Sequence, residues 1–120
     1  MRLSLALALL PCLAYSQTYA HGLNQCAREF YDPKNYHWIS YENICEQAIH
    51  ITLVGASKLK PFTSGVDLKP GQHDGPGLSA DEVKSYGGLT AYVCPAGFFA
   101  VDAADRRIVL KVVDQFTCKK

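Results

Sequence analysis

The sequence has almost no net charge: 12 Lys and Arg side chains stand against 11 Asp and Glu, a formal charge of +1 over 120 residues. A chain so balanced offers no basic surface for nucleic acid, so we expect no nucleic-acid partner. Only 19% of the residues are charged and 48% are hydrophobic, which excludes an intrinsically disordered chain. The length predicts one domain and excludes a multi-domain enzyme or a repeat array.

Several motifs that carry known chemistry are also missing. There is no GxSxG nucleophile turn and no GxxxxGK or GxGxxG phosphate-binding loop. No Asn-x-Ser/Thr acceptor for N-linked glycans occurs. No two cysteines are spaced as CxxC, which argues against a zinc site. We therefore assign no catalytic residues, no metal ligands and no cofactor, and we expect a protein that is not an enzyme.

The N-terminal sixteen residues have the pattern of a secretory signal peptide. Met1-Arg2 is a short basic region, and the apolar run 3–10 follows it. That run is too short to cross a bilayer, which takes about 20 apolar residues. We expect a secreted or periplasmic protein with no membrane insertion after the signal is cleaved.

Two cleavage sites compete. Small residues at Ala14 and Ser16 favour a cut after Ser16, which leaves a single domain over 17–120. The alternative is a cut after Ala20, which leaves His21 as the first residue.

Either cut removes Cys12 and leaves an even number of cysteines: Cys26, Cys45, Cys94 and Cys118. In an oxidising compartment four cysteines predict two disulfides. Cys45 begins one strong strand and Cys94 ends another, so antiparallel neighbours would join Cys45 to Cys94 and leave Cys26 for Cys118. The local pairing, Cys26 with Cys45 and Cys94 with Cys118, remains open beside this preferred one.

The clearest strand is 45–54, in which Ile49, Ile51 and Leu53 share one face by the two-residue period of a strand. Residues 21–44 look irregular apart from a short strand over 36–41. The other expected strands, in chain order, are 58–68, 89–94, 98–102, 107–113 and 116–118. Short strands between turn signals predict a mainly β fold, a small disulfide-stapled β-sandwich or a partly closed barrel.

One short helix is expected at about residues 80–86. Ser79 followed by Glu82 is the capping-box pattern, and two glycines after Tyr86 end the helix. The preceding segment, 69–78, holds three Gly and two Pro and is predicted to be a loop.

An aromatic cluster lies between Phe30 and Tyr41 and includes Trp38, the only tryptophan. Most of these rings are expected in the core, because a lone tryptophan is usually buried. Tyr31 and Tyr36 are the expected exposed members, and with Trp38 they are candidates for stacking on sugar rings. His73 and Asp74, in the glycine-rich loop, are the other candidate ligand contacts.

A copper site is an alternative that depends on the cut after Ala20. The amino group and imidazole of His21 would then form a bidentate copper site. His37, His50 or His73 would supply a second imidazole. A His-Gly start resembles the beginning of secreted copper monooxygenases and copper carriers.

A succession of short motifs over about residues 38–118 resembles small secreted bacterial proteins of unassigned function. In these proteins an Asn-x-Cys opens a strand, as at Asn43–Cys45 here, a Pro-Gly loop follows as at Pro70–Gly71, and a Cys-Pro-x-Gly turn comes later as at Cys94–Gly97. The resemblance implies a bacterial exported β domain and brings no catalytic residues with it.

These observations predict a non-catalytic binding domain that acts in the periplasm or outside the cell. Its ligand would be an envelope polymer, a sugar or another protein. Copper binding through His21 is the first alternative. A small secreted hydrolase is the second, and it requires His73, Asp74 or His50 to cluster in one pocket.

Overall fold

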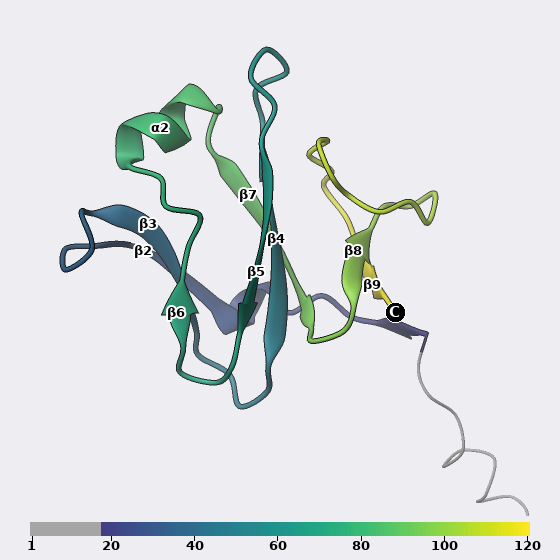
Figure 1. Ribbon diagram of the computed structural model, residues 1–120. Helices are drawn as coiled ribbons and strands as arrows, with labels where there is room; N and C mark the ends of the chain where they lie inside the picture. Colours follow the sequence, from purple (N-terminus) through teal and green to yellow (C-terminus); the bar gives the residue numbers. More distant parts are fainter. Residues whose placement is uncertain (1–17) are drawn as a thin grey trace, which may run out of the picture.

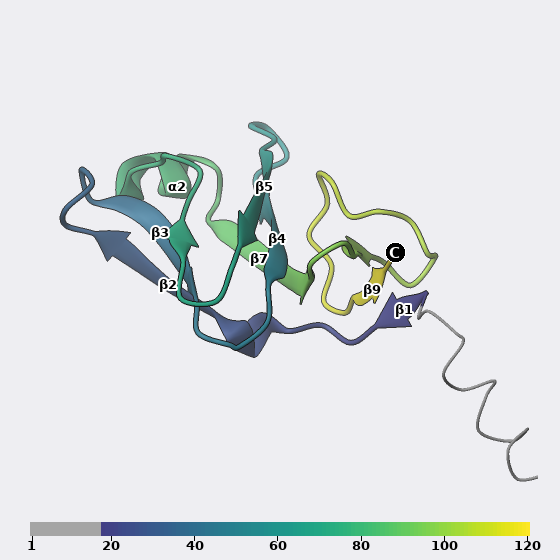
Figure 2. The same ribbon diagram turned by 60° about the horizontal axis from the view of Figure 1, so that its bottom comes forward.

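The computed structural model describes residues 18–120, so the predicted signal peptide lies outside the described residues. Within this range nine strands form three antiparallel sheets of three strands each, with one short α-helix and one 3-10 turn. One sheet lies in the middle and the other two lie on either side of it (Figures 1 and 2). The prediction of a mainly β, disulfide-stapled domain with one short helix is confirmed.

The central sheet has the strand order β5-β4-β7, formed by β5 (Thr63–Leu68), β4 (Ile49–Gly55) and β7 (Leu89–Pro95). On one face of β4, Ile49, Ile51 and Leu53 are fully buried. The opposite face carries His50 and Thr52, which are half-buried, and then the fully buried Val54. The alternation expected from the sequence therefore forms, and hydrophobic clusters cover both faces of this sheet.

The first side of the central sheet is covered by the sheet β2-β3-β6 and by α2. These elements are β2 (Ala27–Asp32), β3 (Trp38–Asn43), β6 (His73–Asp74) and α2 (Ala80–Ser85). Their buried side chains join those of the central sheet in one cluster that includes Ile39, Tyr41, Leu78 and Val83. The first side is the larger part of the core.

The 3-10 turn η1 (Asn24–Cys26) covers the free edge of β7. The Asn24 side chain accepts a hydrogen bond from the Val93 backbone N–H at 2.8 Å, and the Leu23 N–H donates to the Val93 carbonyl at 2.7 Å. These contacts satisfy backbone groups that an edge strand leaves unpaired.

The second side of the central sheet is covered by β1 (Tyr19–Ala20), β9 (Thr117–Lys119) and β8 (Phe99–Val101), in the order β1-β9-β8. A long irregular segment, 102–116, closes this side. It is held by the buried Tyr92, whose hydroxyl donates to the Val113 carbonyl at 2.9 Å and accepts from the Val113 N–H at 2.7 Å.

The helix begins as the sequence predicts. The Ser79 hydroxyl accepts from the Glu82 N–H at 3.3 Å, and the Glu82 carboxylate accepts from the Ser79 N–H at 3.0 Å. This reciprocal capping box satisfies two amides that a helix start leaves free. Gly87 and Gly88, both with positive φ, follow the last turn.

The disulfides join Cys26 to Cys45 and Cys94 to Cys118, so the preferred pairing of Cys45 with Cys94 is wrong. Cys94 does lie in a neighbour of β4, but its register partner is His50 and not Cys45. Cys45 precedes β4, in a turn held by the Asn43 side chain. That side chain accepts from the Cys45 N–H and donates to the Gln47 carbonyl.

Three strand predictions need correction. β2 forms inside the region expected to be irregular, because six of its residues pair with β3. The two-residue β6 forms inside the predicted loop 69–78. Segment 107–113 is not a strand, and its one ladder contact is an isolated bridge between Arg107 and Val101.

No helix among residues 18–120 combines the length and the apolar character that crossing a membrane requires.

Candidate functional site

The turn between β2 and β3 has an unusual backbone. Its chain reversal is organised by Asp32, whose carboxylate accepts from the Lys34 N–H at 2.9 Å and whose carbonyl accepts from the His37 N–H at 2.9 Å. Tyr36 and His37 then adopt φ values of 58° and 56°. For side chains with a Cβ this left-handed conformation costs about 1–2 kcal/mol per residue. The backbone of both residues is therefore strained, and the side chains of both are exposed.

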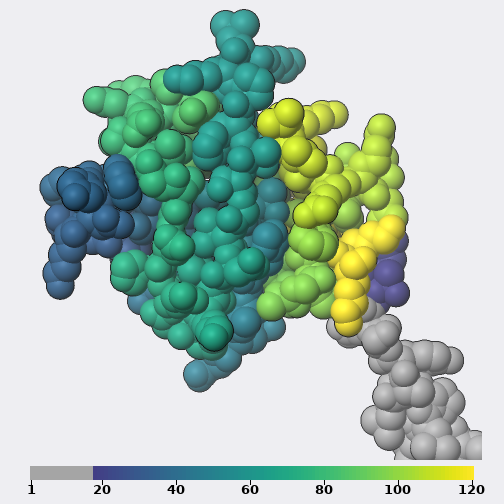
Figure 3. All heavy atoms as spheres, viewed as in Figure 1, coloured from purple at the N-terminus to yellow at the C-terminus, as the bar shows by residue number. Residues whose placement is uncertain are grey.

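Two aromatic rings at this tip are in contact, one exposed and one half-buried, with their planes tilted by 43°. Tyr36 is 79% exposed, and its ring packs on that of Trp38 with centroids 5.1 Å apart. Trp38 itself is half-buried, so the expectation that it belongs to the core is wrong. Of the predicted aromatic cluster only Tyr41, 1% exposed, lies in the core. The tip projects from the body of the molecule in Figure 3 (dark blue).

A small cavity of about 80 Å³ lies beside the Trp38 ring. It is lined by polar groups from three segments: Asn35 of the turn, Ser40 of β3 and Asp74 of β6. Gly75 closes it, and a Cβ at that position would collide with the Ile39 carbonyl oxygen. The close approach of the glycine backbone to β3 therefore shapes the cavity.

The outer face of this sheet continues from Trp38 toward His73. The Nδ1 of His73 is 4.0 Å from the buried Asp32 carboxylate, and its ring meets the edge of Phe30 at 5.7 Å. Arg28 lies over the other part of this surface, 4.6 Å from the centre of the Phe30 ring. Charged and aromatic groups thus alternate along the face.

The structure does not gather the five predicted ligand contacts on one face: Asp74 pairs with the buried Tyr41, whereas His73 pairs with Glu42. Trp38 and Asp74 line the cavity, and the Tyr36 ring contacts that of Trp38. His73 lies on the outer face beside Phe30. Tyr31 pairs with the buried Ile39, so it lies on the opposite face of the hairpin.

His50 forms a separate site on the second side of the central sheet. Its Nδ1 is 2.7 Å from the Asp67 carboxylate, and its ring meets the edge of Phe99 at 5.4 Å. The adjacent cavity, about 290 Å³, is lined by Thr52 and Arg107 among others and contains neither His73 nor Asp74. His50 therefore shares no cavity with His73 or Asp74 among the described residues.

The cleavage that the copper alternative requires conflicts with the pairing of the N-terminal strand β1. Tyr19 and Ala20 pair with Lys119 and Cys118 of β9, so a cut after Ala20 would remove β1. His21 is exposed directly after this strand. Over the described range, no three His, Cys, Asp or Glu side chains are placed to hold a metal ion together.

Two of the groups with a shifted pKa are Tyr41 in β3 and Asp102 on the second side of the central sheet. Burial, reinforced by the Glu29 carboxylate that accepts its hydrogen bond at 2.9 Å, raises the pKa of Tyr41 far above its ordinary value. On the second side, the Arg106 and Ala104 backbone amides lower the pKa of Asp102.

Sequence reasoning missed Asn35 and Ser40. Asn35 was visible only as a turn residue, and nothing local distinguishes Ser40 from any other strand serine. Both residues line the cavity only because β6 pairs with β3, with Tyr41 opposite Asp74 and Glu42 opposite His73. The sequence gives no local sign of that pairing.

Comparison with known proteins adds no relative: no family model, no curated protein and no solved structure matches this chain.

Proposed function

We propose that this protein is a non-catalytic carbohydrate-binding domain that acts in the periplasm or outside the cell. Its binding site is the hairpin tip, defined as Tyr36 and Trp38 with the cavity residues Asn35, Ser40 and Asp74. The observation that supports the proposal is the Tyr36–Trp38 ring contact, tilted at 43°, in which Tyr36 is 79% exposed and lies in a turn with two consecutive left-handed residues.

The chemistry of the tip fits a sugar ring. An aromatic face offers a flat apolar surface to the C–H groups of a sugar, and it loses little conformational entropy when it does so. The Asn35 amide can both donate and accept, and the Asp74 carboxylate, which already accepts from the Gly75 N–H, has further lone pairs for sugar hydroxyls. A cavity of about 80 Å³ receives a hydroxyl or a small ring substituent rather than a whole sugar. The ring would therefore lie across the aromatic pair.

The strain at the tip supports a binding role. Left-handed residues other than glycine persist only where the surrounding structure holds them, and they concentrate at ligand sites. Here the Asp32 turn holds Tyr36 and His37, while neither residue contributes to the buried core.

The compartment is supported by the disulfides. Two bridges within a small domain are typical of oxidising environments outside the cytoplasm. The carbonyl of Thr18 accepts from the Lys120 N–H at 2.9 Å, so residues from Thr18 onward belong to the fold. This favours cleavage after Ser16 over cleavage after Ala20.

A glycan array probed with the oxidised protein tests the proposal, and binding is then quantified by calorimetry with any glycan retained. Trp38→Ala and Tyr36→Ala are each expected to weaken binding by about tenfold or more. Tyr31→Ala is the matched control, because Tyr31 is an exposed tyrosine on the opposite face of the same hairpin. It should change the affinity by less than about twofold.

Two further substitutions distinguish the contribution of the Tyr36 ring to binding from the effect of its left-handed backbone on stability. Tyr36→Phe keeps the ring and should bind nearly as well as the parent. Tyr36→Gly removes the ring but suits the positive φ, so it should lose binding while the protein becomes no less stable. An array without any retained glycan, or a Tyr36→Ala protein that binds as tightly as the parent, would overturn the proposal.

A further inference from the structure

Segment 107–113 (Arg-Ile-Val-Leu-Lys-Val-Val) has the composition of a strand but lacks a strand partner. The Ile108 N–H donates to the Ala100 carbonyl, and Val113 is held by the Tyr92 hydroxyl. Between these two anchors, the backbone groups of residues 109–112 make no hydrogen bond to any other described residue. Four consecutive residues therefore offer free backbone donors and acceptors.

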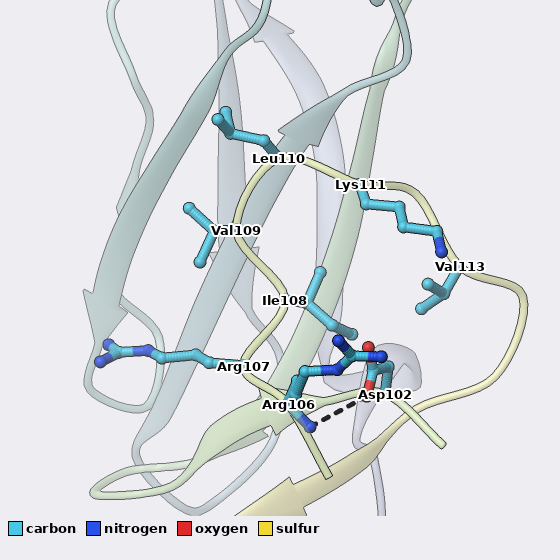
Figure 4. A pocket seen from close by; sticks show the side chains of 8 residues that line it. All are labelled: Asp102, Arg106, Arg107, Ile108, Val109, Leu110, Lys111 and Val113. Carbon is cyan, nitrogen blue, oxygen red and sulfur yellow. Dashed lines mark hydrogen bonds between the residues drawn. The ribbon is translucent and has the colours of Figure 1, made fainter. Parts of the chain in front are cut away.

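The side chains of this stretch are apolar and uncovered. Val109 is 45% exposed, Leu110 55% and Val112 38%. Beside them lies a hollow of about 330 Å³ with Ile108 and Val113 in its lining and charged residues around it (Figure 4). Single exposed hydrophobic residues are ordinary on protein surfaces. Three close together along unpaired backbone form the kind of edge that natural proteins usually protect.

The charges that flank the stretch are self-complementary. In an antiparallel pair of two such segments centred on Leu110, Arg106 of one copy lies opposite Asp114 of the other. A shift of one residue places Arg107 opposite Asp114 and Val109 opposite Val112. Either register forms two opposite-charge pairs related by the two-fold axis, and such cross-strand pairs stabilise a sheet.

We propose that two copies of this protein associate through this segment, which straightens into an antiparallel strand pair across a two-fold axis. The backbone groups of 109–112 would then be satisfied, and Leu110 of each copy would be covered by the other. A contact of one short strand buries less than the roughly 1,200 Å² of a stable interface. We therefore expect a weak dimer that appears as the concentration rises.

Sedimentation equilibrium of the oxidised protein over about three decades of concentration tests this. Leu110→Lys should raise the dimer dissociation constant by about tenfold or more, because it places two ammonium groups at the centre of the pair. Leu59→Lys is the matched control: Leu59 is 99% exposed on the turn before β5, outside the segment. It should leave the dissociation constant unchanged.

Charge reversal tests the antiparallel arrangement and finds its register. Asp114→Arg alone should weaken the dimer. Combination with Arg106→Asp or with Arg107→Asp should restore it, and the combination that does so identifies the residue opposite Asp114. Arg107 also stacks on Phe99 at 3.8 Å, so the thermal midpoint of each variant is measured beside its association.

Three results would overturn the proposal. The first is a protein that stays monomeric at every concentration, which would leave the segment to an unrelated partner. The second is a dimer that Leu110→Lys does not weaken. The third is a dimer weakened by Asp114→Arg that neither double variant restores.

Discussion

The two sides of the central sheet are built by different means. The first side contains a cluster of eleven buried residues, under a hairpin of two six-residue strands and a capped helix. The second side contains six, under strands of only two or three residues and the long segment 102–116. Each side has one disulfide, and the two close similar lengths of chain, 19 and 24 residues. Equal covalent staples therefore support unequal amounts of packing and strand pairing.

The difference indicates which interactions fix the structure of each side. On the first side, hydrogen-bonded strands and side-chain packing place the residues, and the Cys26–Cys45 bridge is added to a structure that is already well specified. On the second side, segment 102–116 contains no strand and is held by separate side-chain and loop contacts, among them the Tyr92 hydroxyl, the ion pair of Asp105 with Lys119 and the packing of Ile108. The Cys94–Cys118 bridge therefore contributes more to fixing the structure of the second side than Cys26–Cys45 does on the first.

Removal of the disulfides is the strongest test of this comparison. Cys94→Ala with Cys118→Ala, and separately Cys26→Ala with Cys45→Ala, should each lower the free energy of unfolding by about 2–5 kcal/mol. Only the first pair should also open one side locally, since β1, β8 and β9 have few other contacts. Urea unfolding measures the stability, and amide hydrogen exchange locates the opening. Equal exchange on both sides in the Cys94/Cys118 variant would contradict the comparison.

Matched core truncations give the next largest effect. Ile51→Ala, at a fully buried position in the first side, should cost about 2–5 kcal/mol, because the sheets around it leave no room to relax. Ile108→Ala, 5% exposed on the second side, should cost about 1–2 kcal/mol, because segment 102–116 can collapse into the space. Urea denaturation compares the two, and a larger loss at Ile108 would reverse our interpretation.

The helix cap tests a local feature of the first side. Ser79→Ala removes the hydroxyl that accepts the Glu82 amide and should cost about 1 kcal/mol. Ser79→Thr keeps a capping hydroxyl and should cost only a few tenths of that. Hydrogen exchange should rise at α2 alone. A rise at β8 or β9 would show that the two sides are coupled more tightly than their separate clusters suggest.

Acid sensitivity is the smallest expected effect and belongs to the second side. Hydrogen bonds from backbone amides hold the pKa of Asp102 below its ordinary value of 3.8. A depressed pKa contributes stability above the unfolded value, and that contribution is lost as the pH falls through the folded value. Asp102→Asn should therefore lower stability at neutral pH and flatten its decline between about pH 5 and 3. Asp114→Asn, at low protein concentration, is the control, and an equal flattening there would contradict the assignment.

The features that sequence predicts well are the ones with local causes. β4 follows from alternating Ile49, Ile51 and Leu53, and α2 follows from the Ser79–Glu82 cap. β2 was missed because its side chains are partly exposed on both faces, so no alternation marks it. The strand prediction for 107–113 was wrong for the opposite reason. Its β-branched residues favour a strand, but the segment forms no ladder with a neighbouring strand.

The candidate site was predictable only in part for the same reason. The aromatic residues Tyr36 and Trp38 stand out by composition, whereas the cavity beside them depends on the pairing of β3 with β6. Likewise the disulfide pairing depends on the register of β4 against β7, which places Cys94 opposite His50. Contacts between distant segments determine both, and the spacing of residues along the chain does not reveal them.

The pairing of β1 with β9 also sets an order in time. During synthesis the chain emerges N-terminal end first, so Cys26 and Cys45 appear early. The hairpin that carries Tyr36 lies between these two cysteines. β1 emerges before either cysteine, yet its partner β9 follows only after almost the whole described chain. The first strand to appear is therefore among the last to pair, and the β2–β3 hairpin can form while the second side is still open.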